Sequence, residues 1–494
     1  MSSINGYYAT TALLFLFVLL LAGYLLSRRQ RARTTADFAV ASRQLGAPRL
    51  VLMNVATYLS AVSLIGFTGY GYASGFALLS FFFGTILGHL PLAVVSRRLH
   101  EWKVNSLPEF FGQRYGNTYL RNWFAIIFIC IYTMYLMLNL VGVAVLLNSV
   151  AGLPAWLSEL VVLVALLTYV ALGGMRTTSL INSVQAAVIL VVVIGGAIWA
   201  IALAGGFGSF FGQVRAVSPV LMSASGGGKI TAGLLLGTTV GWMGGVATRA
   251  DFGAQALSGS RARVAGWTLG LPAIIVVVVY FCLNIIGLSA RVHVPNVASA
   301  DAAFPLFFKD VLPGWTGWLM IIALLSGITA ACDSYILTIS TMVGNDIVKP
   351  LRSLARKAAG DADRVAVRAA RITVLVASAV AYGISLTHLP LLALATLNLF
   401  IIWGSACFVP LYAGLLWRGG SALAAGISSL VGGALGLIWI YVPVPFGQGD
   451  GAVVGIVASL IVYVALSMVN RLTGRFPQPS HSQMPPATLT GQVE

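Results

Sequence analysis

The run Asn54-Val-Ala-Thr-Tyr-Leu-Ser-Ala-Val-Ser-Leu-Ile-Gly-Phe-Thr-Gly-Tyr-Gly-Tyr72 lies inside an apolar stretch at residues 49–73. Its middle is rich in hydroxyl groups and glycines, among them Ser60, Ser63 and Gly66. Glycine weakens a helix, and hydroxyls can satisfy backbone groups that a break leaves free. We therefore predict a helix interrupted near mid-membrane, where carbonyl oxygens and half-helix ends could hold an ion or a solute. The alternative is that the small residues only permit close helix packing.

A second stretch of the same character lies at residues 230–250, five apolar spans further along the chain. It carries glycines at 233, 237, 241, 244 and 245, the adjacent threonines Thr238 and Thr239, and Trp242. Two glycine-rich helices five spans apart are what an inverted repeat of five helices would give. The sequence thus predicts interruptions within residues 55–70 and 235–247, with a cavity between them.

Composition places the whole chain in a membrane. Of 494 residues, 59% are hydrophobic and only 9% are charged, and the mean hydropathy is +0.92. Soluble domains carry about 25% charged residues. The apolar runs are continuous and about 20 residues long, whereas the strands of a membrane β-barrel alternate over about 10 residues. We predict an all-α membrane protein.

The apolar runs define about 13 transmembrane helices. They fall at residues 7–27, 49–73, 76–96, 121–149, 156–172, 179–205, 230–250, 264–289, 314–343, 369–388, 390–416, 421–442 and 452–471. Loops rich in arginine and lysine alternate with loops that are poor in them; residues 28–49, for example, carry six arginines. Basic loops face the cytoplasm. We therefore expect a multi-pass inner (plasma) membrane protein, with the N-terminus outside and the C-terminus in the cytoplasm.

The net charge of +16 is explained by these basic loops, so no nucleic-acid partner is expected. The four cysteines lie within apolar runs without metal-ligand spacing, which disfavours a metal site. No cluster of His, Asp or Glu within the spans supports hydrolysis, and no phosphate-binding glycine loop supports direct use of ATP. We expect no enzyme, no catalytic residue and no cofactor apart from a coupling ion.

Asp333 is the clearest acid within a span, in Ile328-Thr-Ala-Ala-Cys-Asp-Ser-Tyr335. The other acids of the chain are expected in loops or near span ends. A carboxylate inside the membrane is costly and marks an ion or proton path by default. The alternative is a structural acid that accepts hydrogen bonds from nearby backbone or hydroxyl groups.

Short motifs in this order resemble the sodium:solute symporter family from about residue 37 to 433. They are Asp37-Phe38, Ala41-Ser-Arg-Gln-Leu-Gly46, Ser60-Ala61, Gly66, Leu107-Pro-Glu-Phe110, Arg114-Tyr-Gly116, Gly173-Gly174, Gln185, Asp301, Phe304-Pro305, Leu312-Pro313, Asp333-Ser334, Asp346 and Gly414-Leu-Leu-Trp417.

The resemblance implies a leucine-transporter-type inverted five-helix repeat that works by alternating access. It divides the chain into an extra helix and cytoplasmic loop (1–48), a first repeat (49–205), a second repeat with connecting loops (206–416), two C-terminal helices (417–475) and a disordered cytoplasmic tail (476–494).

The family's typical sodium site falls on carbonyls of Ala56, Leu59 and Gly327, and its paired hydroxyls fall on Ala330 and Ala331. Alanine supplies no side-chain oxygen, which would severely weaken sodium binding. The family's Thr-Asp pair is also replaced here, by Ile181-Asn182. These departures favour coupling to protons, or to no ion at all, in place of sodium. If protons are used, Asp333 is the expected carrier, with Asn182 and Ser334 on its path. Ordinary sodium coupling through a rearranged site is the alternative.

The resemblance and the small residues predict a solute site lined by Ser60, Ser63, Phe67, Tyr70, Tyr135 and Trp242. It shows no obvious charged anchor, and a small organic acid or amino acid is the expected solute. A transporter-like solute sensor is a weaker alternative, since the sequence shows no signalling domain. The bilayer and the solute are the expected partners, and the oligomeric state is left open.

Overall fold

The computed structural model describes residues 6–29, 32, 34–225, 231–354, 359–386, 392–441 and 451–473. Within these ranges the regular structure is helical, apart from one isolated β-bridge between Leu45 and Gly259. The tail that the sequence predicts to be disordered, residues 476–494, lies outside the described residues.

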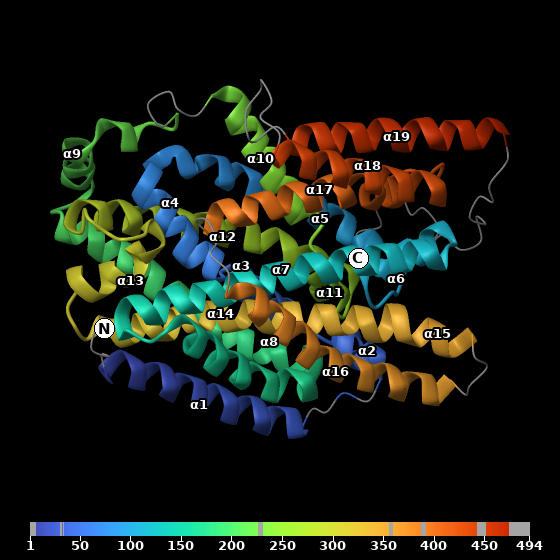
Figure 1. The fold of residues 1–494 in the computed structure, drawn as a ribbon, viewed down its shortest axis with the longest axis horizontal. Helices are drawn as coiled ribbons and strands as arrows, with labels where there is room; N and C mark the ends of the chain where they lie inside the picture. Colours follow the sequence, from blue (N-terminus) through green and yellow to red (C-terminus); the bar gives the residue numbers. More distant parts are fainter. Residues whose placement is uncertain are drawn as a thin grey trace.

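The long helices lie side by side along the longest dimension of the molecule (Figure 1). They are α1 (Gly6–Arg29), α5 (Leu79–Glu101), α7 (Thr118–Ala151), α8 (Ala155–Leu203), α12 (Ala262–His293), α14 (Thr316–Thr341), α16 (Ala359–Ser385), α17 (Leu392–Leu416), α18 (Ala422–Tyr441) and α19 (Gly451–Thr473). The predicted all-α membrane architecture is confirmed.

The predicted number of 13 spans is not confirmed, because ten described segments are long and apolar enough to cross a membrane. The predicted span 49–73 is divided between two short helices. The spans predicted at 156–172 and 230–250 correspond to shorter apolar helices, Ala155–Leu167 and Ala232–Ala247.

Shorter helices connect and interrupt the long ones. They are α2 (Thr35–Val40), α3 (Ala47–Tyr58), α4 (Phe67–Ser74), α6 (Leu107–Tyr115), α9 (Phe207–Val217), α10 (Ala232–Ala247), α11 (Ala250–Leu257), α13 (Ala303–Leu306) and α15 (Lys349–Leu354). Tight or wide helical turns join several of them, namely η1 (Ala41–Arg43), η2 (Val62–Gly66), η3 (Gly75–Leu78), η4 (Pro219–Met222), η5 (Ala300–Ala302), η6 (Phe307–Val311) and η7 (Met342–Val348).

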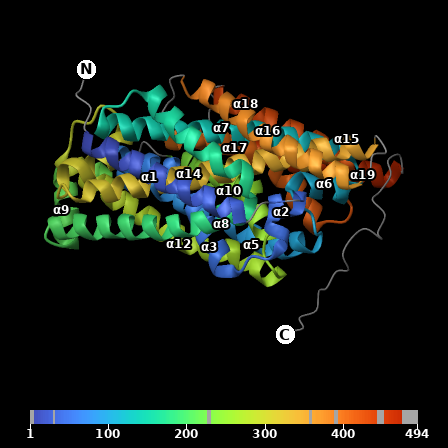
Figure 2. The same ribbon diagram turned by 90° about the horizontal axis from the view of Figure 1, so that it is seen from below.

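Helix α14 forms the centre of the bundle. It is enclosed on all sides over most of its length, because every residue from Ala323 to Thr341 is buried. It packs against α7, α8, α16 and α3. Helices α18 and α19 pack on each other and on α17 at one side of the bundle, while α1 lies on α8 at the other (Figures 1 and 2).

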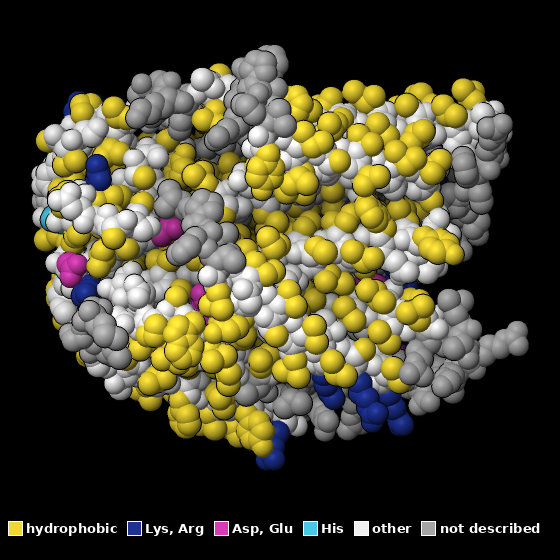
Figure 3. All heavy atoms as spheres, viewed as in Figure 1, with side chains coloured by type: hydrophobic (Ala, Val, Ile, Leu, Met, Phe, Trp, Pro, Cys, Tyr) yellow, Lys and Arg dark blue, Asp and Glu magenta, His cyan; other side chains and the backbone are white. Residues whose placement is uncertain are grey.

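The surface agrees with a membrane location. Exposed large apolar side chains occur on α1, α8, α12, α16 and α19, and apolar atoms cover much of the face shown in Figure 3. Lysine and arginine side chains gather toward the lower right of this view, near α15 and α16 (Figures 1 and 3).

The first predicted interruption is present. Helix α3 ends at Tyr58, Leu59 has non-helical backbone angles (φ −81°, ψ 59°), and the chain continues through the wide turn η2 into α4. The break therefore lies in the hydroxyl-rich middle of the quoted run.

The second interruption is not where the sequence predicts it. Residues 235–247 form an unbroken part of α10, and the helical path is broken after it, at Thr248 and Arg249, before α11 begins. The glycines of α10 permit close packing instead. A methyl group on Gly245 would overlap the Phe400 ring, and one on Gly244 would lie 3.1 Å from Gly404. The simpler interpretation of these glycines is thus the right one.

Candidate functional site

Side chains replace the backbone hydrogen bonds that are lost at the break after α3. The Asn139 side chain on α7 accepts a hydrogen bond from the backbone N–H of Ala61 at 3.1 Å. The Ser63 hydroxyl donates to the carbonyl of Tyr58 at 2.7 Å. Satisfied backbone groups let an irregular segment persist in a water-poor interior.

Two of the predicted ion-site positions, Leu59 and Gly327, meet where the end of α3 packs against α14. A methyl group on Gly327 would overlap the carbonyl oxygen of Leu59, so only glycine permits this approach. Ala56, Ala330 and Ala331 are fully buried. The alanine side chains bring methyl groups to the positions where the resemblance implies hydroxyls.

Asp333, Asn182 and Ser334 form one buried cluster beside these positions. The Asn182 amide donates to Asp333 Oδ1 at 3.1 Å and to the Ala330 carbonyl at 3.1 Å. The Ser334 hydroxyl lies 3.3 Å from Asp333 Oδ1 and 2.9 Å from the Ala330 carbonyl. The structure thus joins three residues that the sequence selects separately.

Hydrogen bonds extend this cluster across the bundle. Ser334 Oγ lies 3.0 Å from Thr57 Oγ1 on α3. The Gln255 amide on α11 donates to Thr57 at 3.1 Å, and Asn54 donates to Gln255 at 3.1 Å. All of these side chains are buried. We call Asp333, Asn182, Ser334, Thr57, Gln255 and Asn54 the polar chain.

A small pocket of about 10 Å³ lies next to the polar chain, close to the least space that holds one water molecule. Its lining includes Ala250 and Ala254 of α11, Thr338 of α14, and Asn105 and Ser106 before α6. Because Thr338 donates to the carbonyl of Ser334, the pocket begins one helical turn from the chain.

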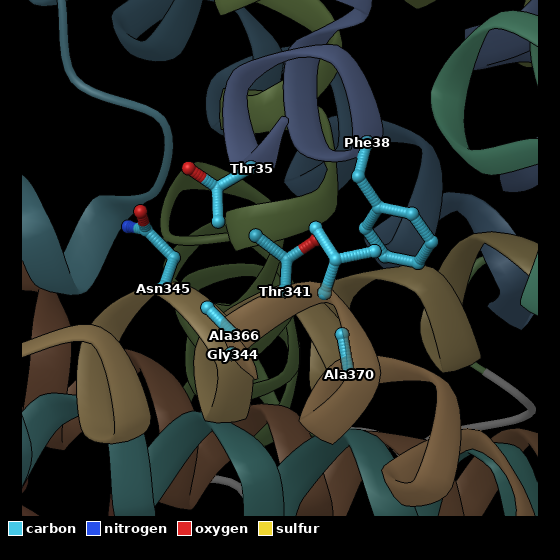
Figure 4. A pocket seen from close by; sticks show the side chains of 8 residues that line it. Thr35, Phe38, Thr341, Gly344, Asn345, Ala366 and Ala370 are labelled. Carbon is cyan, nitrogen blue, oxygen red and sulfur yellow. The ribbon is translucent and has the colours of Figure 1, made fainter. Parts of the chain in front are cut away.

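A second pocket of similar size continues along the same helix and shares Thr341 with the first. In Figure 4, Thr35 and Phe38 of α2 face Thr341, and Ala366 and Ala370 of α16 lie on the other side. The two pockets follow α14 and η7 toward the end of the bundle where α6 and α15 lie (Figure 1).

Aromatic rings enclose the other side of the break. Phe67 packs on Trp242 and Tyr280, with ring centroids 5.2 and 4.4 Å apart. The Trp242 indole N–H lies 3.1 Å from the Tyr58 hydroxyl, and Tyr135 stacks on Tyr335 at 4.6 Å.

Of the predicted solute-site residues, five are buried around the break: Ser60, Ser63, Phe67, Tyr135 and Trp242. The sixth, Tyr70, is only partly buried and packs on Phe81 at 5.3 Å. It lies almost one helical turn beyond Phe67 on α4, at the rim of the cluster.

A buried charged pair lies beside the predicted solute-site residues, for which the sequence shows no obvious charged anchor. Arg249 and Asp251 follow the break after α10 and are 1% and 2% exposed. Arg249 Nε donates to Asp251 Oδ1 at 3.0 Å, and the Tyr132 hydroxyl donates to the same oxygen at 2.5 Å. The sequence signal for this buried pair is an arginine and an aspartate directly after a glycine-rich span. Sequence reasoning missed it because both residues stand at the end of the predicted span, where charged residues are expected.

Asp333 is also not the only buried acid, contrary to the expectation from span positions. Glu159, Asp251, Asp301 and Asp346 are each 5% exposed or less. Asp346 accepts hydrogen bonds from Arg121 and Ser106, which joins α6, α7 and η7. Acids near predicted span ends are buried because the ends of these helices are covered by neighbouring segments.

Asp301 joins three segments at the opposite end of the bundle. Its carboxylate accepts a hydrogen bond from the backbone N–H of Leu392, the first described residue of α17, at 3.1 Å. A methyl group on Gly69 of α4 would lie 2.8 Å from its other oxygen, which has no hydrogen-bond partner among the described residues. Burial raises the pKa of Asp301 from 3.8 to about 6.

A bundle of apolar helices with two breaks in the helical path beside a buried polar centre is an arrangement typical of secondary transporters. The sequence model of the sodium:solute symporter family matches residues 38–432. The chain belongs to this family, as its motifs predict, and is a transporter and not an enzyme.

Two curated relatives illustrate the similarity. The chain is 26% identical over 453 residues to the osmoregulated proline transporter OpuE of Bacillus subtilis, covering 88% of this chain and 89% of the relative. It is 23% identical over 429 residues to the sodium/pantothenate symporter of Escherichia coli, covering 83% and 86%.

Solved structures establish the fold. A Na⁺-coupled sialic acid symporter in a substrate-bound outward-open state matches with a TM-score of 0.74 and 16% identity, over 94% of this chain and 98% of that one. Mhp1, a nucleobase-cation-symport-1 transporter in a closed conformation, matches with a TM-score of 0.58 and 14% identity, over 92% and 99%. The predicted leucine-transporter type of fold is confirmed.

Proposed function

We propose that this secondary transporter carries a small organic acid or amino acid by alternating access and couples its movement to protons. The observation that carries the proposal is the buried contact of Asp333 with Asn182 and Ser334, beside two alanines at the hydroxyl positions of the family's sodium site.

Ion chemistry supports proton coupling. Sodium is held by a shell of several oxygens, and Ala330 and Ala331 contribute none from their side chains. A carboxyl group needs only one hydrogen-bonding neighbour to take or release a proton, and Asp333 has a neutral amide and a hydroxyl. Protonation would also remove the cost of a buried negative charge during transport.

The polar chain supports a route for that proton. Serine, threonine and amide side chains run from Asp333 to Asn54 at hydrogen-bonding distances. The adjoining pockets follow α14 away from the break. We propose that protons exchange between Asp333 and the cytoplasm on this side, consistent with the orientation inferred from the basic loops.

The cargo class is supported by the printed cargoes of the relatives. Proline, pantothenate and sialic acid all bear a carboxyl group, and all three name proteins similar to this chain. The buried site of small hydroxyl and aromatic side chains fits a cargo of that size.

Sodium coupling is the second candidate, and one contact favours it. The carbonyl oxygen of Leu59, which the resemblance assigns to the sodium site, lies next to Gly327, and this closeness supports sodium binding through backbone oxygens. The sensor alternative has no comparable observation in its favour.

Reconstitution in liposomes separates these candidates. We expect an inward proton gradient without sodium to drive accumulation of at least one acid from a panel. Asp333→Asn is expected to abolish accumulation and to retain exchange of labelled for unlabelled solute, while Asp37→Asn, which changes an acid on the short helix α2, preserves both. Accumulation that requires sodium at fixed pH and voltage would contradict proton coupling.

A further inference from the structure

The ion pair between Arg249 and Asp251 carries a large desolvation cost for a contact that is only structural. Both residues are almost fully enclosed, and removing two charges from water costs several kcal/mol per ion, by order of magnitude. Apolar side chains of similar size would stabilise the same position at least as well. The pair stands at the break between α10 and α11, in the part of the bundle that the solute site occupies.

The guanidinium lies in a box of aromatic rings. Its carbon is 3.8 Å from the centroid of the Phe252 ring and 5.4 to 5.6 Å from the rings of Tyr58, Tyr135 and Tyr335. Three of these rings come from α3, α7 and α14. Such faces hold a guanidinium in place without neutralising its charge, so its position is fixed while it can still bind an anion.

Part of the hydrogen-bonding capacity of the box is unused. Arg249 donates through Nε and Nη2 to Asp251, and Nη2 also lies 3.4 Å from the Tyr335 hydroxyl; no described residue accepts from Nη1. The Ser60 hydroxyl is near that of Tyr135, yet it is buried and meets no partner with hydrogen-bond geometry among the described residues. The Arg249 guanidinium and the Ser60 hydroxyl therefore both lie close to Tyr135.

Asp251 has support of its own. The Tyr132 hydroxyl donates to its Oδ1 at 2.5 Å, and the backbone N–H of Asp251 lies 2.9 Å from that hydroxyl. This carboxylate would keep a strong hydrogen bond if the guanidinium turned partly toward another anion. Arg249 is the N-cap of α11: its backbone N–H donates to the carbonyl of Val246 and its carbonyl accepts from the N–H of Gly253, so any turn toward another anion is confined to its side chain.

We propose that Arg249 binds the carboxylate of the cargo, and that Asp251 is the counter-ion that occupies the guanidinium while the site is empty. The inference rests on the proposed function, because it assigns the anchor for an acid cargo. Arginine presents two parallel N–H donors to a carboxylate. Ser60 then receives a polar group of the cargo, and Phe67 and Trp242 contact its apolar part.

The test compares each acid with its neutral isostere on purified protein and in liposomes. Suitable pairs are L-proline with L-prolinamide, pantothenate with pantothenol, and lactate with lactamide. Thermal stabilisation of the protein reports binding, and uptake reports transport. We expect the wild type to bind at least one acid and to discriminate strongly against its isostere.

The decisive variant is Arg249→Gln/Asp251→Asn, which removes both charges and leaves neither one buried alone. It should bind the acid about 100-fold more weakly and no longer distinguish it from the neutral isostere, while Arg249→Lys retains part of the discrimination. Asp251→Asn should be stabilised by the acid more than the wild type is, because the carboxylate supplies the missing counter-charge. Arg114→Gln removes another buried arginine, one that donates to carbonyls at Gly414 and Trp417, and should leave the discrimination intact.

Two results would overturn the inference while leaving a carrier of small solutes in place. One is equal binding of acid and isostere by the wild type, and the other is undiminished discrimination by the doubly neutral variant. Failure of every acid in the panel to bind or enter liposomes would instead contradict the proposed function, and with it the cargo class assumed here.

Discussion

At the scale of single residues, the sequence is most informative where a family position carries an unexpected side chain. Ala330, Ala331 and Asn182 stand out as departures, and the structure joins Asn182 to Asp333 and to the carbonyl of Ala330. Arg249 and Asp251 do not stand out, because hydropathy assigns charged residues to span ends. A backbone break inside the bundle buries such residues, and that geometry is not visible in hydropathy alone.

Restored hydroxyl groups should restore a response to sodium. Ala330→Ser/Ala331→Ser adds two oxygens near the carbonyls of Leu59 and Gly327, so we expect sodium to stimulate uptake by this variant and not by the wild type. Uptake at fixed pH and voltage, with sodium or a large organic cation, measures the effect. Ala323→Ser adds a hydroxyl to the same helix two turns away and should give no stimulation; equal sodium dependence of all three proteins would contradict the prediction.

The carboxyl group of Asp301 should make stability depend on pH. Burial raises the pKa of Asp301 in the folded protein to about 6 from 3.8. The stabilisation of the folded state by the protonated carboxyl group is therefore fully present below pH 4 and is lost as the pH rises through 6. The free energy of unfolding is thus lower at pH 7 than below pH 4 by roughly 3 kcal/mol. Asp301→Asn keeps an acceptor for the N–H of Leu392 and carries no charge, so it should be more stable than the wild type at pH 7.

Thermal melting of the two proteins between pH 4 and pH 8 checks this sign. The melting temperatures should converge toward pH 4, separate as the pH rises from 4 through 6, and differ by a constant amount at higher pH. Curves that stay parallel over the whole range would show that the charge of Asp301 has no such effect.

At the scale of elements, the interruption after α3 was predictable because hydroxyl groups and glycines coincide in its middle. The interruption near α10 was predicted at the wrong place because a cluster of glycines can mark either a helix break or close helix packing, and the sequence does not distinguish the two. Gly241, Gly244 and Gly245 each bring α10 close to a side chain or backbone of α17. The actual break follows at Thr248, where no glycine stands.

Close packing makes a prediction for α10. Gly245→Ala would place a methyl group within the Phe400 ring's van der Waals envelope, and overpacking of this kind costs about 1–3 kcal/mol. Gly195→Ala on α8 meets no atom within 4 Å and should be neutral or slightly stabilising, because alanine favours helix. Melting in the same detergent measures both variants, and an equal loss of stability in the two would contradict the packing explanation.

At the scale of the whole molecule, composition and apolar length were enough to predict a helical membrane bundle. The number of spans was not, because α8 runs through two predicted spans with a kink at Gly174, and short helices replace a single rod at residues 49–73. One continuous helix and two consecutive helices give similar hydropathy profiles.

The predicted orientation has its own test. Helices α9 and α6 lie at opposite ends of the molecule (Figure 1), so cysteines introduced at Ala216 and Gln113 should differ in exposure. In a variant without the native cysteines, a membrane-impermeant thiol reagent should label Ala216→Cys in intact cells and Gln113→Cys only after lysis. The reverse pattern would invert the proposed topology.

The most direct test of proton-coupled transport is the internal pH of liposomes that contain the protein, recorded when a cargo is added outside in sodium-free buffer. The cargo is one that does not cross the bilayer as the free acid. Proton symport predicts internal acidification that accompanies uptake, disappears in Asp333→Asn and does not change when sodium is added. Uptake without acidification that begins only when sodium is supplied would contradict it.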